Sequence, residues 1–236
     1  MKGDGEAGFR AGLGVSVPLV LGYFPIAFSF GVAATQSGLT GGEAFLLSAV
    51  IYAGAAQFLA LALITAGMPL ALAAFTLVAM NLRHVLYGPA LMKRAADQAS
   101  RRYALIWAFG LTDEVFGAAL GALARGVRFS EPFMLGLGLG AYGAWLSGTA
   151  LGALAGGGAL QAWPAVSAGL GFMLPALFLS LLLSILKRAQ VPLIAIAGVA
   201  TLVATLAWSA TIGLLAGMIA GALAGVLGIG RDQDAR

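Results

Sequence analysis

The amino-acid sequence predicts an all-α integral membrane protein with seven or eight transmembrane helices. Hydrophobic residues make up 61% of the 236 residues and charged residues 9%, whereas soluble domains carry about a quarter charged residues. The apolar residues form blocks of roughly 20, the length that an α-helix needs to cross about 30 Å of hydrocarbon. They do not alternate with polar residues, as they do in the strands of an outer-membrane barrel. Too little polar surface remains to coat a water-soluble protein of this size.

Eight hydrophobic segments account for most of the chain, and short stretches rich in glycine, serine, threonine or charge connect them. None of these connections is long enough for an extramembrane domain, so we expect one membrane domain over residues 1–236. Ala56–Leu61 resembles Ala176–Leu181, which predicts a weak internal repeat of about 120 residues. The segments cover residues 11–34, 44–66, 69–92, 103–124, 133–155, 166–186, 190–207 and 209–228.

The positive charges predict how the chain is oriented in the membrane. The net charge is +4, and the lysines and arginines lie in short loops, where they indicate orientation rather than nucleic-acid binding. Lys2 and Arg10 predict a cytoplasmic N-terminus. Eight full crossings then put the basic loop at 93–102 outside, against the rule. If segments three and four were both re-entrant, every basic loop would be cytoplasmic. Full crossings are preferred because each segment is long enough to span, and both arrangements stay open.

The composition also limits the chemistry. The chain has no cysteine and one histidine, which excludes disulfides and thiolate metal sites and disfavours a histidine-cluster metal site. No nucleotide-binding loop or nucleophile motif is present. We therefore expect no metal, no cofactor and no enzymatic activity. The enzyme hypothesis that remains is a membrane-embedded acid–base pair of His84 and Asp113.

The most unusual stretch is Asn81–His84, which lies inside the third apolar segment. An uncompensated arginine at the bilayer centre costs roughly 2.5–3.5 kcal/mol on insertion scales, so Arg83 needs a partner or a task. Asp113 and Glu114 in the fourth segment are the obvious counter-charges. Arg83 and Asp113 each lie about ten residues, or roughly 15 Å, from the basic loop between the two segments. Two antiparallel neighbours would put them at the same depth, which predicts an Arg83–Asp113 pair.

The same stretch predicts irregular backbone. Asn81 and Arg83 would lie about 160° apart on a regular helix, so either protein surrounds the helix at this point or the backbone is unwound. Gly88 and Pro89 follow closely and favour irregularity. A broken or re-entrant path for segments three and four is compatible with this pattern.

Three more candidates come from the first two segments. Pro25 removes a backbone donor, so it predicts either a structural kink or a broken helix that lines a cavity. Gln57 needs hydrogen-bond partners in lipid, and Tyr52 begins the run of small residues that precedes it. Gln57 serves either a helix–helix hydrogen bond or the transport pathway.

Together these motifs resemble the AzlC family, the large subunits of bacterial branched-chain amino acid exporters. The resemblance covers about residues 9 to 230. It implies a bacterial inner-membrane transporter that acts with a small second membrane protein of the AzlD type, which this chain does not contain. The runs that carry it are Gly22–Pro25 with Phe30–Gly31, Tyr52–Phe58, Asn81–Gly88 and Thr112–Glu114.

A branched-chain amino acid offers a carboxylate, an ammonium and an apolar side chain. Arg83 can bind the carboxylate through two parallel hydrogen bonds, and Asp113 or Glu114 can hold the ammonium or carry a coupling proton. His84 can titrate near neutral pH. The alternative is a structural Arg83–Asp113 pair in a subunit that assembles but does not transport. The predicted substrate-binding residues are Asn81, Arg83, His84, Asp113, Glu114, Gln57, Tyr52 and Pro25.

Overall fold

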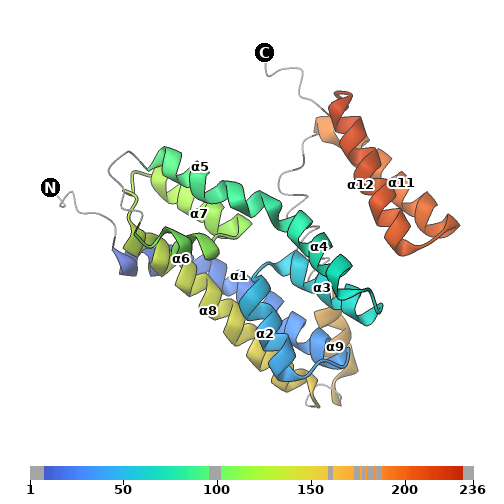
Figure 1. Cartoon of the computed structure of the whole chain (residues 1–236), viewed down its shortest axis with the longest axis horizontal. Helices are drawn as coiled ribbons and strands as arrows, with labels where there is room; N and C mark the ends of the chain where they lie inside the picture. Colours follow the sequence, from blue (N-terminus) through green and yellow to red (C-terminus); the bar gives the residue numbers. More distant parts are fainter. Residues whose placement is uncertain are drawn as a thin grey trace. The chain divides into compact units, whose positions relative to one another are not determined.

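The computed structural model describes residues 8–95, 102–158, 162–172 and 188–230, with four single residues between 176 and 186. All regular elements in these ranges are helices (Figure 1). The chain forms two compact units, residues 1–174 and 175–236, and each is described by itself.

The observed helices follow the predicted segments closely. Segment six coincides with α9 at its start, and the remainder lies mostly outside the described residues. The first unit contains α1 (Phe9–Gln36), α2 (Gly41–Ile51), α3 (Gly54–Thr65), α4 (Leu70–Asn81), the 3₁₀ helix η1 (Leu82–Leu86), α5 (Tyr87–Arg94), α6 (Ala104–Phe109), α7 (Asp113–Ala124), α8 (Glu131–Gly156) and α9 (Pro164–Gly171). The second contains η3 (Arg188–Gln190), α11 (Val191–Ala207) and α12 (Ala210–Val226).

The core of the first unit is the contact between α1 and α8, which run side by side and parallel (Figure 1). Gly12 meets the backbone at Phe133, and Gly31 meets it at Thr149. A Cβ atom on Gly31 would lie 2.3 Å from the Thr149 carbonyl oxygen, and one on Gly152 would lie 2.0 Å from the Phe28 oxygen. Glycine is therefore required here because the two backbones touch, as small residues allow in membrane helices.

Helix α1 continues through both of its prolines. It runs unbroken from Phe9 to Gln36, with Pro18 and Pro25 inside it. Of the two alternatives for Pro25, the broken helix is therefore wrong. A proline in a membrane helix is tolerated where a neighbouring helix supports the backbone, and the close packing against α8 supplies that support.

Segment two, predicted as one helix, is instead divided into two helices, and nothing in its sequence predicted the break. Helix α2 starts with a capping box, in which Thr40 and Glu43 satisfy each other's backbone N–H groups. It ends at Tyr52, whose φ of 38° is left-handed. Ala53 is extended and α3 begins at Gly54. Among the described residues, Tyr52 is the single non-glycine residue with positive φ; this conformation costs roughly 1–3 kcal/mol and is often found at functional sites.

Segments three and four are both irregular, as predicted. Segment three stays helical but tightens to a 3₁₀ turn between α4 and α5, and the 25 residues Leu70–Arg94 are long and apolar enough to span a membrane. Since α4, η1 and α5 follow each other without a reversal, the path favours a crossing over a re-entrant loop. Segment four is interrupted between α6 and α7, where Thr112 is extended.

The second unit is a helical hairpin of α11 and α12 (Figure 1). Gly213 faces Thr205 and Gly217 faces Thr201, so the two helices are antiparallel and close. Residues 188–207 form another apolar helix of membrane-spanning length.

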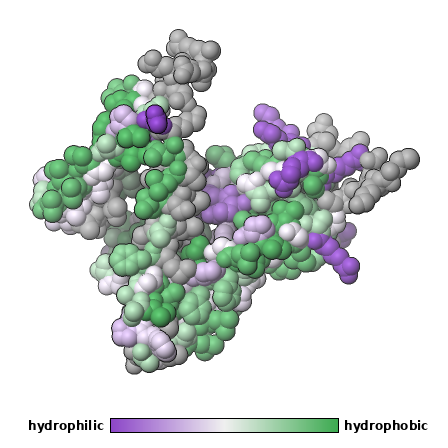
Figure 2. All heavy atoms as spheres, turned by 180° about the vertical axis from the view of Figure 1, so that it is seen from behind, coloured by the Kyte–Doolittle hydropathy of each residue, from purple (hydrophilic) through white to green (hydrophobic). Residues whose placement is uncertain are grey.

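Hydrophobic side chains also cover the outside of the described chain. Figure 2 shows hydrophobic residues over much of the visible face. Helices Phe9–Gln36, Leu70–Arg94 and Arg188–Ala207 are long and apolar enough to cross a bilayer. This is the surface that a membrane protein presents to lipid.

Candidate functional site

The predicted pair of Arg83 and Asp113 is present. Arg83 Nε donates to Asp113 Oδ1 at 3.0 Å, and Nη2 donates to Oδ2 at 2.8 Å. The Tyr87 hydroxyl donates to the same carboxylate. This is the bidentate geometry in which guanidinium and carboxylate bind most strongly. The pairing of segments three and four at one depth is therefore confirmed.

Local backbone structure positions both partners. Arg83 lies in η1, which places it and Tyr87 on the side of α7. Asp113 is the first residue of α7, where Thr112 caps the helix by accepting the Val115 N–H at 3.2 Å. Carboxylates are favoured in the first turn because the helix N-terminus carries partial positive charge.

The pair is open rather than enclosed. The side chains of Arg83 and Asp113 are 48% and 47% exposed. His84 Nε2 lies 3.6 Å from Asp113 Oδ1, too far for a hydrogen bond. The buried Oδ1 atom of Asn81 has no hydrogen-bond partner among the described residues. The site thus has an exposed ion pair and a nearby imidazole.

Glu114 belongs to a second polar group, although it follows Asp113 directly. The Tyr23 hydroxyl lies 2.6 Å from Glu114 Oε2 and 2.5 Å from Thr112 Oγ1. Tyr23 is 6% exposed and Thr112 7%. Tyr23 was not selected from the sequence, although Pro25 was selected from the same run, Gly22–Pro25. In the structure the Tyr23 side chain contacts α7, whereas Pro25 lies inside α1.

Tyr52 lies in an aromatic cluster at the α2–α3 break. Its ring packs edge-on against Tyr142 at 4.8 Å between centroids and stacks on Phe109 at 6.2 Å. Tyr23 and Trp145 complete the cluster. The buried Tyr52 hydroxyl has no hydrogen-bond partner among the described groups. A buried polar atom without a partner is uncommon and marks a group free to bind something else.

Gln57 makes a helix–helix network instead of joining the ion pair. It is fully buried, its side-chain oxygen accepts the Trp145 indole N–H at 2.5 Å, and its amide donates to Ser48 at 2.7 Å. Ser48 and Thr149 hydroxyl oxygens are 2.6 Å apart. These bonds tie α2, α3 and α8 together and support the structural alternative for Gln57. Its partner Trp145 had no signal in the sequence.

Comparison with known protein families identifies the family of this chain. The family model of the AzlC protein matches residues 18–158. The chain belongs to the AzlC family. The matched residues contain every polar group described above, from Tyr23 to Thr149. No solved structure matches this chain.

Three relatives show how widely this AzlC-family sequence is shared. The inner membrane protein YgaZ of Escherichia coli (strain K12) is 44% identical, over 89% of this chain and 86% of that protein. An uncharacterized membrane protein of Archaeoglobus fulgidus is also 44% identical, over 79% of this chain and 80% of that protein. The branched-chain amino acid transport protein AzlC of Bacillus subtilis (strain 168) is 24% identical, over 73% of this chain and 66% of that protein.

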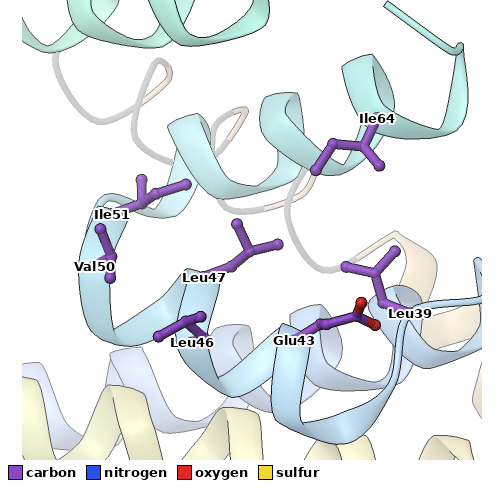
Figure 3. Close-up of a pocket in the computed structure, with 7 residues that line it drawn as sticks. All are labelled: Leu39, Glu43, Leu46, Leu47, Val50, Ile51 and Ile64. Carbon is purple, nitrogen blue, oxygen red and sulfur yellow. The ribbon is translucent and has the colours of Figure 1, made fainter. Parts of the chain in front are cut away.

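A groove between α2 and α3 of this AzlC-family chain has a different character. Its volume is about 360 Å³, and its lining is almost wholly apolar apart from Glu43 at one end (Figure 3). None of the residues predicted from the sequence to bind substrate lines it. No group of three acidic or histidine residues among the described ones could hold a metal ion. The lining residues are Leu39, Glu43, Leu46, Leu47, Val50, Ile51 and Ile64.

Proposed function

We propose that this chain is the large subunit of a secondary transporter that exports branched-chain and other small apolar amino acids. The observation that carries the proposal is the bidentate, half-exposed Arg83–Asp113 pair, which joins a helix of membrane-spanning length, Leu70–Arg94, to the start of α7. The name of the Bacillus subtilis relative supports the substrate class. Transport is coupled to an ion gradient, with the proton as the proposed ion.

The pair can exchange its internal contacts for those of a zwitterion. The substrate carboxylate takes the two guanidinium N–H groups of Arg83, and the substrate ammonium donates to Asp113. Each charge is compensated before and after binding, so neither side chain is left unpaired in the membrane. The zwitterion thus binds between Arg83 and Asp113, which already face each other before it arrives.

Neighbouring groups complete this proposed site. His84 lies beside Asp113, with its Nε2 atom 3.6 Å from Asp113 Oδ1. The exposed apolar residues of η1, among them Val85 and Leu86, offer contacts to an aliphatic side chain. This arrangement favours small apolar amino acids, because it supplies one positive group, one negative group and no further charge for the side chain.

The proposal includes a partner and a location. The resemblance to the AzlC family implies a small AzlD-type membrane subunit. In an apolar stretch of 18 residues within Leu70–Arg94, 6% of the residues are buried by the described chain, which leaves room for such a subunit. The Escherichia coli relative is an inner membrane protein, which supports the bacterial inner membrane as the location. The charges of Lys2 and Arg10 favour a cytoplasmic N-terminus.

Efflux of radiolabelled valine or leucine from proteoliposomes tests the proposal. The chain and its small partner are each reconstituted alone and then together, and unlabelled apolar, acidic and basic amino acids compete from the inside. We expect efflux that apolar amino acids inhibit and charged ones do not. Efflux with the partner alone would instead make this chain a non-transporting assembly subunit. Absence of efflux in every combination would refute the proposed substrate.

A further inference from the structure

The two adjacent carboxylates at the start of α7 have opposite surroundings. Asp113 is held by both guanidinium nitrogens of Arg83 and by the Tyr87 hydroxyl. Glu114 accepts one hydrogen bond, from Tyr23, and no Lys, Arg or His nitrogen among the described residues lies within 4.0 Å of it. When two neighbouring acids have such different environments, they usually perform different roles.

We propose that Glu114, and not Asp113, is the carboxyl group that takes up and releases the coupling proton. This assignment rests on the proposed transport function and refines it. A proton on Asp113 would displace hydrogen bonds from a guanidinium, which favours the ionised acid. A proton on Glu114 breaks no ion pair.

The hydrogen bonds around Glu114 can be written for both protonation states. With the carboxylate ionised, Thr112 donates to Tyr23 and Tyr23 donates to Glu114. With the carboxyl protonated, Glu114 donates to Tyr23 and Tyr23 donates to Thr112. Both contacts, at 2.6 and 2.5 Å, serve either direction because a hydroxyl can donate and accept. The Thr112 oxygen keeps the Val115 N–H in both states. The Tyr23 hydroxyl hydrogen turns from Glu114 to Thr112, and the Thr112 hydroxyl hydrogen turns away from Tyr23.

The step itself forms and breaks a single O–H bond. A proton from water on one side of the membrane binds the carboxylate of Glu114, and the acid returns it to water on the other side. No electron transfer or further reactant is needed. The substrate site begins at the neighbouring residue, with consecutive Cα atoms about 3.8 Å apart. The charge on Glu114 and a substrate bound at Asp113 therefore interact electrostatically.

Several other groups around α7 can titrate or carry charge, and the test must separate them from Glu114. His84 is the main rival, because an unperturbed imidazole titrates near neutral pH. The Tyr52 ring lies edge-on to Tyr23, and its hydroxyl has no hydrogen-bond partner among the described groups. The groups are Tyr23 from α1, Tyr52 from the α2–α3 break, Arg83 and His84 from η1, Tyr87 from α5, Asp113 from α7 and Tyr142 from α8.

Two assays on the same proteoliposomes test the assignment. One measures exchange of labelled for unlabelled valine at equal pH; the other measures net valine movement driven by a pH difference, with a trapped dye to follow protons. We expect Glu114→Gln to lose the pH-driven movement and the proton signal and to retain exchange. Glu114→Asp should restore part of the driven movement, and Asp113→Asn should lose both activities. Glu43→Gln is the matched control, because Glu43 is exposed on α2 and glutamine can still cap that helix.

Other results would overturn the assignment. The first is full pH-driven transport by Glu114→Gln, and the second is loss of both exchange and pH-driven transport in that variant. The third is a proton signal that is lost in His84→Gln but not in Glu114→Gln. If wild-type protein exchanges no amino acid, the proposed function itself fails and the assignment falls with it. Infrared spectroscopy gives a check that does not need transport: one carboxylic acid band that titrates in wild type and in Asp113→Asn should be missing from folded Glu114→Gln, while the bands of the other acids stay. Persistence of that one band in Glu114→Gln would also overturn the assignment.

Discussion

Removing Arg83 separates a transport role from a structural one. In Arg83→Ala, two hydrogen bonds to a carboxylate disappear, each worth about 1.5–3 kcal/mol when one group is charged. Half of each side chain is exposed, so we take about 3 kcal/mol for the substrate contact, or roughly 100-fold weaker binding. Export from cells loaded with valine should therefore be abolished at ordinary substrate levels.

The same change should barely affect the amount of protein. An exposed ion pair contributes about 0–1 kcal/mol to stability, which predicts membrane abundance within about twofold of wild type. A structural buried pair would cost about 3–5 kcal/mol when one partner is removed, and most of the protein would then vanish from the membrane.

Immunoblots of membranes beside valine efflux assays distinguish these outcomes. Arg83→Lys keeps the charge but loses the bidentate fork, so it should recover part of the activity, and Arg10→Ala at an exposed site on α1 should change neither readout. Normal export by Arg83→Ala, or loss of the protein from the membrane, would refute the reasoning.

Three further substitutions and one control test the scaffold in detergent-purified protein. Gly152→Ala places a Cβ atom 2.0 Å from a backbone oxygen of α1, so it should lower Tm by the equivalent of about 1–3 kcal/mol or more; Gly143→Ala, with open space around it, should not. Gln57→Leu leaves the buried Trp145 N–H without its acceptor, at about 1–3 kcal/mol, and an unchanged Tm would contradict the network. Tyr52→Phe removes a hydroxyl with no described partner, so Tm should hold or rise, and a clear fall would reveal a hidden partner.

Segment boundaries and the ion pair were predictable because each rests on local chemistry. Apolar blocks of membrane-spanning length mark helices such as α1 and α8, whatever packs against them. Arg83 and Asp113 could be paired because both lie at similar distances from one basic loop, so helix rise alone fixes their relative depth.

The second polar group was not predictable, because its partners are distant in sequence. Tyr23 and Glu114 are separated by 91 positions, and nothing in either run indicates the other. The α2–α3 break was missed for a different reason: the left-handed Tyr52 is neither glycine nor asparagine, the residues that usually signal this conformation. For Pro25 the sequence left a kink and a broken helix as alternatives, and only the packing against α8 excludes the break.

The three backbone interruptions differ in what covers them, and this difference favours η1 as the place where substrate binds. Tyr52 at the α2–α3 break is 4% exposed and Thr112 at the α6–α7 break is 7% exposed. No residue of η1 is buried among the described part of the chain. At membrane depth, irregular backbone is tolerated where it is enclosed by protein or lines a water-filled cavity. The first two interruptions meet the first condition within the described chain, so η1 needs a partner subunit or an aqueous path beside it. In the transport function proposed above, such a path would end at Arg83.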